Sequence, residues 1–134
     1  MSFEVTHLSV LLADDDEAWR ESLGQFFLRE GFHVYFAATG LEAIDVLKKG
    51  QVNFSVMDVQ MPGLTGIQVL EILRSDGRVG PCIFVSGETS KDLQLKAMSV
   101  GAFTFLSKPV ELDIMRFTVQ QLLKKFFPGS GKPF

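Results

Sequence analysis

One pattern occurs twice in this chain, as VLLADDD at residues 10–16 and as FSVMD at residues 54–58. In both places a short apolar run ends in aspartate. A third apolar run, at residues 103–106, is followed by the pair Lys108-Pro109. Because the carboxyl ends of parallel strands meet at one edge of a sheet, three such runs would bring acids and an amine together. Oxygen ligands and an amine at one edge suit a divalent cation and a phosphoryl group.

Composition limits the classes of protein that fit the chain. Its 134 residues match one domain, and 46% hydrophobic residues with a mean hydropathy of +0.21 are enough for a buried core. A net charge of -3 gives no general basic field, so we expect no direct contact with nucleic acid. The apolar runs are too short to cross a bilayer, and we expect no membrane contact. A single cysteine, Cys82, and a start that does not resemble a secretory signal favour the cytoplasm.

Short apolar runs alternate with longer segments that have helical spacing. The runs predicted as buried strands are residues 8–13, 34–37, 54–57, 82–85 and 103–106. The segments predicted as helices are residues 17–30, 41–47, 67–73, 90–100 and 112–126. This alternation predicts an α/β fold, a doubly wound five-stranded parallel sheet with helices on both faces. We expect one domain at residues 1–127, with residues 128–134 as a natural flexible tail or an artificial end.

Several predicted helices have an apolar face, which indicates the side packed on the sheet. In the first helix this face consists of Trp19, Leu23, Phe26 and Phe27. The second helix has Leu41, Ile44 and Leu47, and the last has Leu112, Met115, Val119, Leu122 and Phe126. Asp15 or Asp16 is well placed to cap the first helix.

The acidic cluster is the strongest candidate for a metal site. Several carboxylates in one crevice repel one another, and a bound cation removes this conflict. Mg²⁺, with Mn²⁺ as an alternative, prefers oxygen ligands; Asp15, Asp58 and the backbone carbonyl of Gln60 could supply them, with Asp14 acting through water. Helix capping is the simpler explanation for one or two of the acids at residues 14–16.

Five motifs in order resemble the receiver domains of two-component response regulators, over about residues 8–127. They are the pair Asp14-Asp15, the segment DVQMPG at residues 58–63, the hydroxyl of Ser86, the aromatic Phe105 and Lys108-Pro109. The resemblance implies a flavodoxin-like (βα)5 fold with strand order 2-1-3-4-5. It also implies a cis bond before Pro109, which aims the Lys108 amine at the site.

The function implied by this resemblance is phosphoryl acceptance rather than turnover of an external substrate. Asp58 would take a phosphoryl group from the phosphohistidine of a sensor histidine kinase or a histidine phosphotransfer protein. Lys108 and Ser86 would bind the transferred group, and the domain would assist its own phosphorylation and dephosphorylation. Ser86 and Phe105 would act as the conformational switch, although Phe105 lacks the phenol hydroxyl found in many receivers.

Two further positions could set the lifetime of the phosphorylated state. Gln60 lies two residues after Asp58, and Glu88 lies two residues after Ser86, where side chains can flank an attacking water. Thr65 departs from the acidic or amide residue common before the glycine of this family, and we expect it to affect only the local turn and helix start.

The motifs do not identify the protein or effector domain that this chain controls, so the chain could be a stand-alone receiver or part of a longer regulator. In the family, the signalling surface comprises the fourth helix, fifth strand and fifth helix, and it contacts a downstream protein or effector domain. Charged residues predicted there are Lys91, Lys96, Arg116 and Lys124. A phosphorylation-dependent homodimer through such a surface is a further expectation.

Two competing interpretations use the same residues. A phosphatase of the haloacid dehalogenase type would use Asp14 as its nucleophile, because residues 14–16 contain an Asp-x-Asp pattern. That class usually has a longer chain and a second acidic pair after its lysine. A protein-binding module with the receiver fold but no phosphorylation is the other, and the intact set of acids, hydroxyl and lysine disfavours it.

Overall fold

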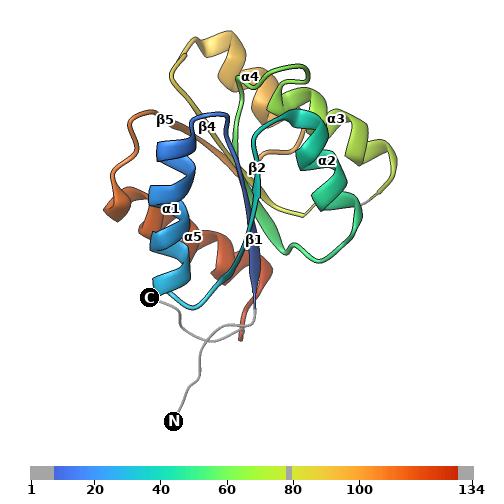
Figure 1. The fold of residues 1–134 in the computed structure, drawn as a ribbon. Helices are drawn as coiled ribbons and strands as arrows, with labels where there is room; N and C mark the ends of the chain where they lie inside the picture. Colours follow the sequence, from blue (N-terminus) through green and yellow to red (C-terminus); the bar gives the residue numbers. More distant parts are fainter. Residues whose placement is uncertain (1–7, 78–79, 130–134) are drawn as a thin grey trace.

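The computed structural model describes residues 8–77 and 80–129, in which five parallel strands form one sheet of order β2-β1-β3-β4-β5 (Figure 1). The strands are β1 (Ser9–Ala13), β2 (His33–Ala37), β3 (Phe54–Asp58), β4 (Cys82–Ser86) and β5 (Thr104–Ser107). The helices are α1 (Glu17–Arg29), α2 (Gly40–Lys48), α3 (Gly66–Ser75), α4 (Lys91–Ser99) and α5 (Leu112–Phe126). The predicted alternation and strand order are therefore confirmed. Residues 1–7 of the predicted domain and 130–134 of the predicted tail lie outside the described residues.

The strands occur where the sequence has short apolar runs. The prediction that all five are buried was wrong for β2, where only Ala37 is buried, and for β5, where no residue is, because these two strands lie at the edges of the sheet. Every residue of β1, β3 and β4 is buried. Neighbouring strands run in parallel. Along each strand, successive side chains point to opposite faces of the sheet and so toward opposite layers of helices. Near-continuous apolar strands are typical of such a sheet.

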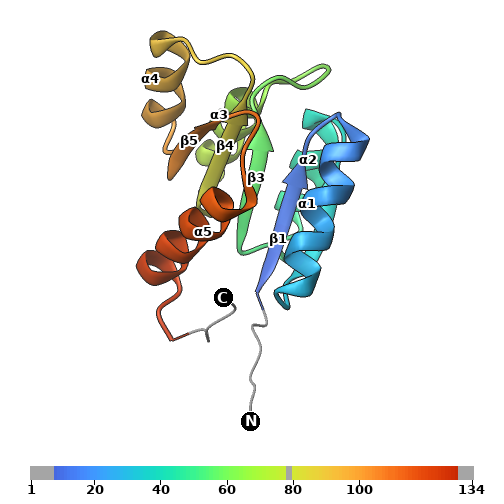
Figure 2. The same cartoon turned by 90° about the vertical axis from the view of Figure 1, so that its left-hand side faces the viewer.

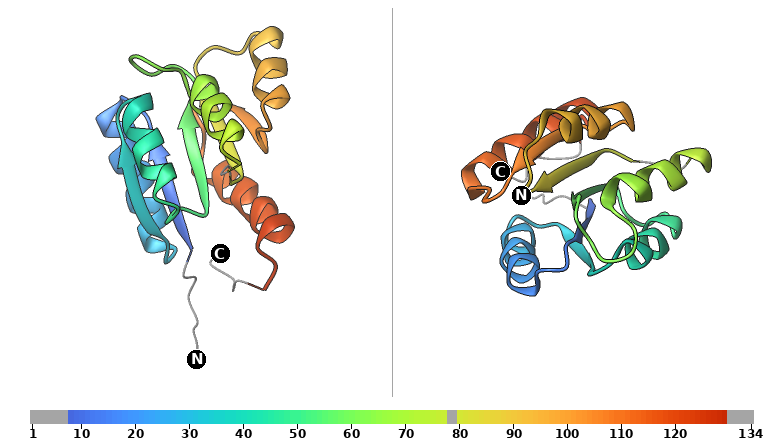
Figure 3. Two further views of the ribbon diagram at one scale, coloured as in Figure 1. Left: turned by 90° about the vertical axis from the view of Figure 1, so that its right-hand side faces the viewer. Right: turned by 90° about the horizontal axis from the view of Figure 1, so that it is seen from above.

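Two layers of helices enclose the sheet (Figures 2 and 3). Helices α1 and α5 cover one face, where Phe27, Phe54 and Leu122 belong to one core cluster. Helices α2, α3 and α4 cover the other face, with Leu11, Leu70 and Phe84 in a second cluster. The packing holds the carboxyl ends of the central strands together at one edge of the sheet.

Side chains at the helix starts fix where the loops at this edge become helix. Asp16 caps α1 and accepts the backbone N–H of Trp19 at 3.2 Å. Thr65 caps α3 in a reciprocal pair with Gln68, in which each side chain accepts the other residue's backbone N–H. This confirms the expected place of Thr65 at the helix start.

The predicted apolar faces of α2 and α5 were wrong at their ends, where the residues expected to be buried are exposed. Leu41 in α2 has an exposed fraction of 66%, and Leu112 and Phe126 at the ends of α5 are exposed by 41% and 43%. The middle of the α5 stripe is buried. Helical periodicity thus continues into end turns that are only partly covered, and Phe126 keeps a ring contact with Phe103 at a centroid distance of 5.9 Å. Among the helices described, none has the length and apolarity required to cross a membrane.

Candidate functional site

The carboxyl-end edge of the sheet brings together residues from four strands. Asp14 follows β1, Asp58 and Ser86 are the last residues of β3 and β4, and Lys108 follows β5. Backbone hydrogen bonds extend the sheet into the loops: Asp14 N–H donates to the Ala37 carbonyl at 3.0 Å, and Lys108 N–H donates to the Ser86 carbonyl at 2.8 Å. The topology thus places these residues at one edge, as the sequence predicts.

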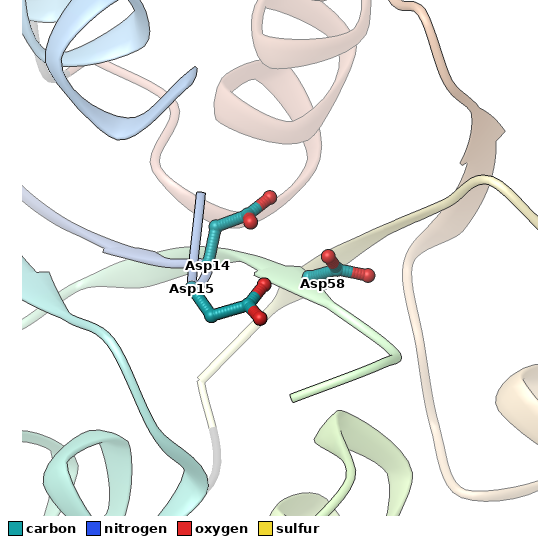
Figure 4. Close-up of side chains that lie close together, drawn as sticks. All are labelled: Asp14, Asp15 and Asp58. Atoms are coloured by element: carbon teal, nitrogen blue, oxygen red, sulfur yellow. The ribbon is translucent and has the colours of Figure 1, made fainter. Parts of the chain in front are cut away.

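Three carboxylates gather at the ends of β1 and β3 (Figure 4). Asp14, Asp15 and Asp58 each offer a carboxylate oxygen, and these oxygens all lie within 4.8 Å of one another. Asp14 and Asp58 are buried, with exposed fractions of 2% and 5%, whereas Asp15 is exposed. The site therefore combines two buried carboxylates with one that is open to solvent.

Lys108 neutralises part of this negative charge. Its ammonium donates hydrogen bonds to Asp14 Oδ2 at 2.7 Å and to Asp58 Oδ2 at 2.9 Å. Burial would lower the pKa of Lys108, but these hydrogen bonds and the two negative charges outweigh it, so the pKa is raised. The amine is therefore a positive charge held beside the Asp58 carboxylate. The Lys108-Pro109 peptide bond is cis, as expected.

The pKa of Asp14 is raised above its ordinary value. Burial is the main cause, and the nearby charge of Asp58 adds to it; hydrogen bonds from Lys108 and the backbone N–H of Asp16 oppose the rise only in part. The single ammonium of Lys108 therefore does not fully offset the burial and mutual repulsion of the three carboxylates. The donor set consists of oxygen atoms, which suits a hard divalent cation. A hydrogen bond from the Gln60 N–H to Asp58 Oδ1 at 3.0 Å also fixes the loop that carries the Gln60 carbonyl.

Ser86 lies fully buried at the end of β4. Its Oγ accepts the backbone N–H of Glu88 at 3.0 Å, which leaves the hydroxyl hydrogen unused by that bond. The exposed Glu88 side chain accepts a hydrogen bond from Ser90 Oγ at 3.3 Å. Ser86 and Glu88 therefore belong to a single turn leading to the cap of α4.

The two remaining predicted residues differ in their surroundings. Phe105 in β5 is half-buried and packs against the core cluster on the α2, α3 and α4 face. Gln60 has its side chain exposed at the site edge. Neither Phe105 nor Gln60 belongs to the carboxylate cluster itself.

Two neighbouring residues of α1 reach the site, and sequence reasoning did not place them there. The Trp19 ring has its centroid 5.7 Å from Lys108 Nζ. Arg20 Nη1 donates a hydrogen bond to the Asp14 carbonyl at 2.7 Å. The helical period identified Trp19 only as a core residue, and Arg20 carries no local signal in the sequence. Their contacts depend on how α1 lies beside the loops of the sheet.

Three of the four charges predicted on the α4-β5-α5 surface are exposed: Lys91, Lys96 and Lys124. Arg116 is only half-exposed. Its Nη2 lies 3.4 Å from Glu30 Oε2, and its Nη1 lies 3.4 Å from Asp113 Oδ1. Its guanidinium carbon lies 5.1 Å from the Phe26 ring centroid. Arg116 is therefore less exposed than expected, because α5 packs this residue toward α1.

A pocket of about 210 Å³ lies at the opposite end of the sheet, near the starts of β3 and β4. Val52, Ser55, Leu73 and Pro81 are among its lining residues, and those described include no charged residue. It holds none of the predicted site residues. The carboxylate cluster is accordingly the better candidate for chemistry.

Comparison with known proteins identifies the same family that the sequence motifs resemble. The family model "Response regulator receiver domain" matches residues 10–120. "Response regulator MprA" of Mycobacterium sp. (strain KMS) is 33% identical over 122 residues, covering 91% of this chain and 53% of that protein. The chain thus spans about half the length of such relatives.

Solved structures show the same fold. The chemotaxis protein CheY4 of Vibrio cholerae has a TM-score of 0.81 and 28% identity, covering 87% of this chain and 99% of that chain. CheY in the CheX-CheY-BeF3-Mg complex from Borrelia burgdorferi has a TM-score of 0.81 and 27% identity, covering 87% and 89%.

These matches cover most of the chain and include the region from β1 into α5. They exclude the phosphatase alternative as the family of this chain. Receiver domains are signalling domains that bind Mg²⁺ at an acidic pocket, and an acidic cluster is present at the matching edge here. The chain therefore belongs to the response regulator receiver domain family of two-component systems.

Proposed function

We propose that Asp58 accepts a phosphoryl group from a phosphohistidine of a sensor histidine kinase or histidine phosphotransfer protein. An oxygen of the Asp58 carboxylate forms the new P–O bond, the N–P bond of the donor breaks, and the leaving imidazole keeps its electron pair and takes a proton. A carboxylate can serve as nucleophile because phosphoryl transfer depends mainly on alignment and charge neutralisation.

The observation that carries this proposal is the contact of 2.9 Å between Lys108 Nζ and Asp58 Oδ2. It puts a positive charge beside the atom that would attack, where negative charge accumulates on the phosphoryl oxygens. Lys108 would then bind the transferred group. The hydroxyl hydrogen of Ser86 would donate to another of its oxygens.

We expect Mg²⁺, or Mn²⁺ in its place, to be held by Asp15, Asp58 and the Gln60 carbonyl, with Asp14 acting through water. The cation would neutralise charge on the phosphoryl oxygens. The proximity of the three carboxylates and the raised pKa of Asp14 support a site for a cation. The Borrelia relative, whose complex contains BeF3 and Mg, also supports this choice.

Ser86 and Phe105 would form the conformational switch. Movement of the Ser86 hydroxyl toward the phosphoryl group would break its bond with the Glu88 N–H and draw the β4–α4 loop inward. Phe105 lies on β5, which pairs with β4, and is half-buried. We expect its ring to turn inward when the Ser86 hydroxyl moves. This movement would alter the α4-β5-α5 surface.

Gln60 and Glu88 would tune the lifetime of the aspartyl phosphate by flanking an attacking water. The exposed positions of both side chains at the site edge support this role. Gln60→Ala should change the rate of spontaneous dephosphorylation without preventing phosphorylation, and an unchanged half-life would remove the proposal for Gln60.

The α4-β5-α5 surface would contact a downstream protein, an effector domain or a second copy of the chain. Its exposed apolar residues support a contact role; Leu95, Met98 and Phe117 are exposed by 59%, 48% and 61%. Because the chain spans about half of its relatives' length, both a stand-alone receiver at residues 1–127 and a part of a longer regulator fit. Action in the cytoplasm, without nucleic acid or membrane contact through this domain, completes the proposal.

Acetyl phosphate with Mg²⁺ tests this function without a protein donor. Intact mass should show one phosphoryl adduct on the wild-type protein, and the adduct should disappear in Asp58→Asn and in the presence of EDTA. Asp45→Asn, which changes an exposed acid in α2, is the matched control and should keep the adduct. Folded protein with bound Mg²⁺ but no adduct would instead favour the protein-binding module.

A further inference from the structure

Trp19 lies at the rim of the site, although the proposed chemistry gives it no role. It is the third residue of α1, is half-buried and packs against the core cluster on the α1 and α5 face. Its ring centroid lies 5.7 Å from Lys108 Nζ. The ring therefore borders both the hydrophobic core and the amine of the site.

This arrangement gives the Lys108 ammonium a partner that carries no negative charge. The face of an indole ring attracts a cation at a centroid distance within about 6 Å. Two hydrogen bonds of the ammonium go to Asp14 and Asp58. The aromatic ring also stabilises the ammonium. Because the ring carries no negative charge, it does not draw the ammonium away from these carboxylates.

The position of Trp19 is fixed from the loop that carries the acids. Its backbone N–H donates to Asp16 Oδ1 at 3.2 Å, and the next residue, Arg20, donates from Nη1 to the Asp14 carbonyl at 2.7 Å. The first bond caps α1, and the second ties its first turn to the residue that follows β1. The ring itself packs against the core cluster on the α1 and α5 face, so it can stay in place while Lys108 changes its hydrogen-bond partners.

We propose that Trp19 is a positioning residue, whose ring keeps the Lys108 ammonium in the site while Lys108 exchanges the Asp58 carboxylate for a phosphoryl oxygen. This inference rests on the proposed function. When Asp58 becomes an acyl phosphate, its negative charge passes to the phosphoryl oxygens, so the bond from Lys108 to Asp58 Oδ2 has to be replaced. The lysine side chain is flexible and 24% exposed, and without the ring its ammonium would spend more time in solvent.

Paired substitutions separate this role from core packing. Trp19→Leu keeps an apolar side chain but removes the aromatic face, whereas Trp19→Phe retains a smaller one. With acetyl phosphate and Mg²⁺, we expect the initial phosphorylation rate to fall about five-fold in Trp19→Leu and about two-fold in Trp19→Phe. Thermal melting should show both variants to be folded. A Trp19→Leu rate within about two-fold of wild type, or equal losses in the two variants, would overturn the proposal.

Fluorescence tests the contact without phosphorylation. Trp19 is the only tryptophan of the chain, so indole emission reports on its surroundings alone. We expect Lys108→Met to change this emission in metal-free protein. Lys125→Met, which removes an ammonium lying 5.4 Å from the Phe126 ring centroid, is the matched control and should not. If wild-type protein takes up no phosphoryl group, the proposed function fails separately; identical emission in wild type and Lys108→Met would overturn the role of Trp19.

Discussion

Lys108 Nζ lies 2.7 Å from Asp14 Oδ2, although 94 positions separate the two residues in the sequence. The contact joins the end of β5 to the end of β1 across the site. Asp14 has a side chain exposed by only 3%, so its carboxylate has little access to water in exchange for this partner. We therefore expect the ion pair to contribute to the stability of the domain.

Lys108→Met should lower the free energy of unfolding of metal-free protein by about 2 kcal/mol, because a buried acceptor loses its charged donor. Chemical denaturation in the presence of EDTA measures the change. Lys124→Met, at an exposed position of α5, is the control and should stay close to wild type. Equal stability of Lys108→Met and wild type would show that the pair contributes nothing net.

Mg²⁺ should raise the melting temperature, because a ligand that binds only the folded state stabilises it by roughly 2.7 kcal/mol at about 100 times its Kd. Asp15→Asn should strongly reduce this effect, since it removes the charge of the exposed acid in the cluster. Asp16→Asn is the matched control, because asparagine can retain the cap of α1. Equal Mg²⁺ responses in the two variants would contradict the ligand set.

Gly66→Ala should destabilise the protein by about 2 kcal/mol, because an added Cβ would lie 2.6 Å from the Asp58 carbonyl oxygen and 2.9 Å from Phe84 Cε1. Gly87→Ala, where an added Cβ meets nothing within 4 Å, should be nearly neutral. Urea denaturation of both variants checks the difference. Similar midpoints would mean that the loop after β3 can shift without cost.

Cys82 should be unreactive in the folded protein. Burial raises the pKa of its thiol from 9.0 to about 12, and a hydrogen bond with Ser55 offsets the rise only in part. The folded thiol thus stays protonated as the pH rises past 9.0, while the unfolded thiol ionises, so this group lowers stability in that range. Labelling by a disulfide reagent at mildly alkaline pH should be slow in buffer and fast in urea, and rapid labelling of folded protein would contradict the burial.

The main features of the fold and site could be predicted because each depends on a local signal. Buried parallel strands require continuous apolar runs; an aspartate directly follows β1, and another is the last residue of β3. Parallel topology then brings Asp14, Asp58, Ser86 and Lys108 to one edge without knowledge of any side-chain contact.

Features that depend on packing between helices could not be predicted in the same way. The exposure of Leu112 depends on how much of α5 its neighbours cover, and the contacts of Arg116 with Glu30 and the Phe26 ring depend on the approach of α5 to α1. The contact between Trp19 and Lys108 joins residues from opposite ends of the sequence. Helical periodicity identifies a buried face but does not specify which residues across the fold it contacts.

The identity of the acceptor residue is the central claim, and borohydride trapping tests it most directly. The hydride reduces an aspartyl phosphate to homoserine, which releases phosphate and marks the acceptor in peptide mass spectra. After treatment with acetyl phosphate and Mg²⁺, we expect homoserine at position 58 and unmodified aspartate at positions 14 and 15. Homoserine at position 14 instead, with Asp58 unmodified, would contradict the account.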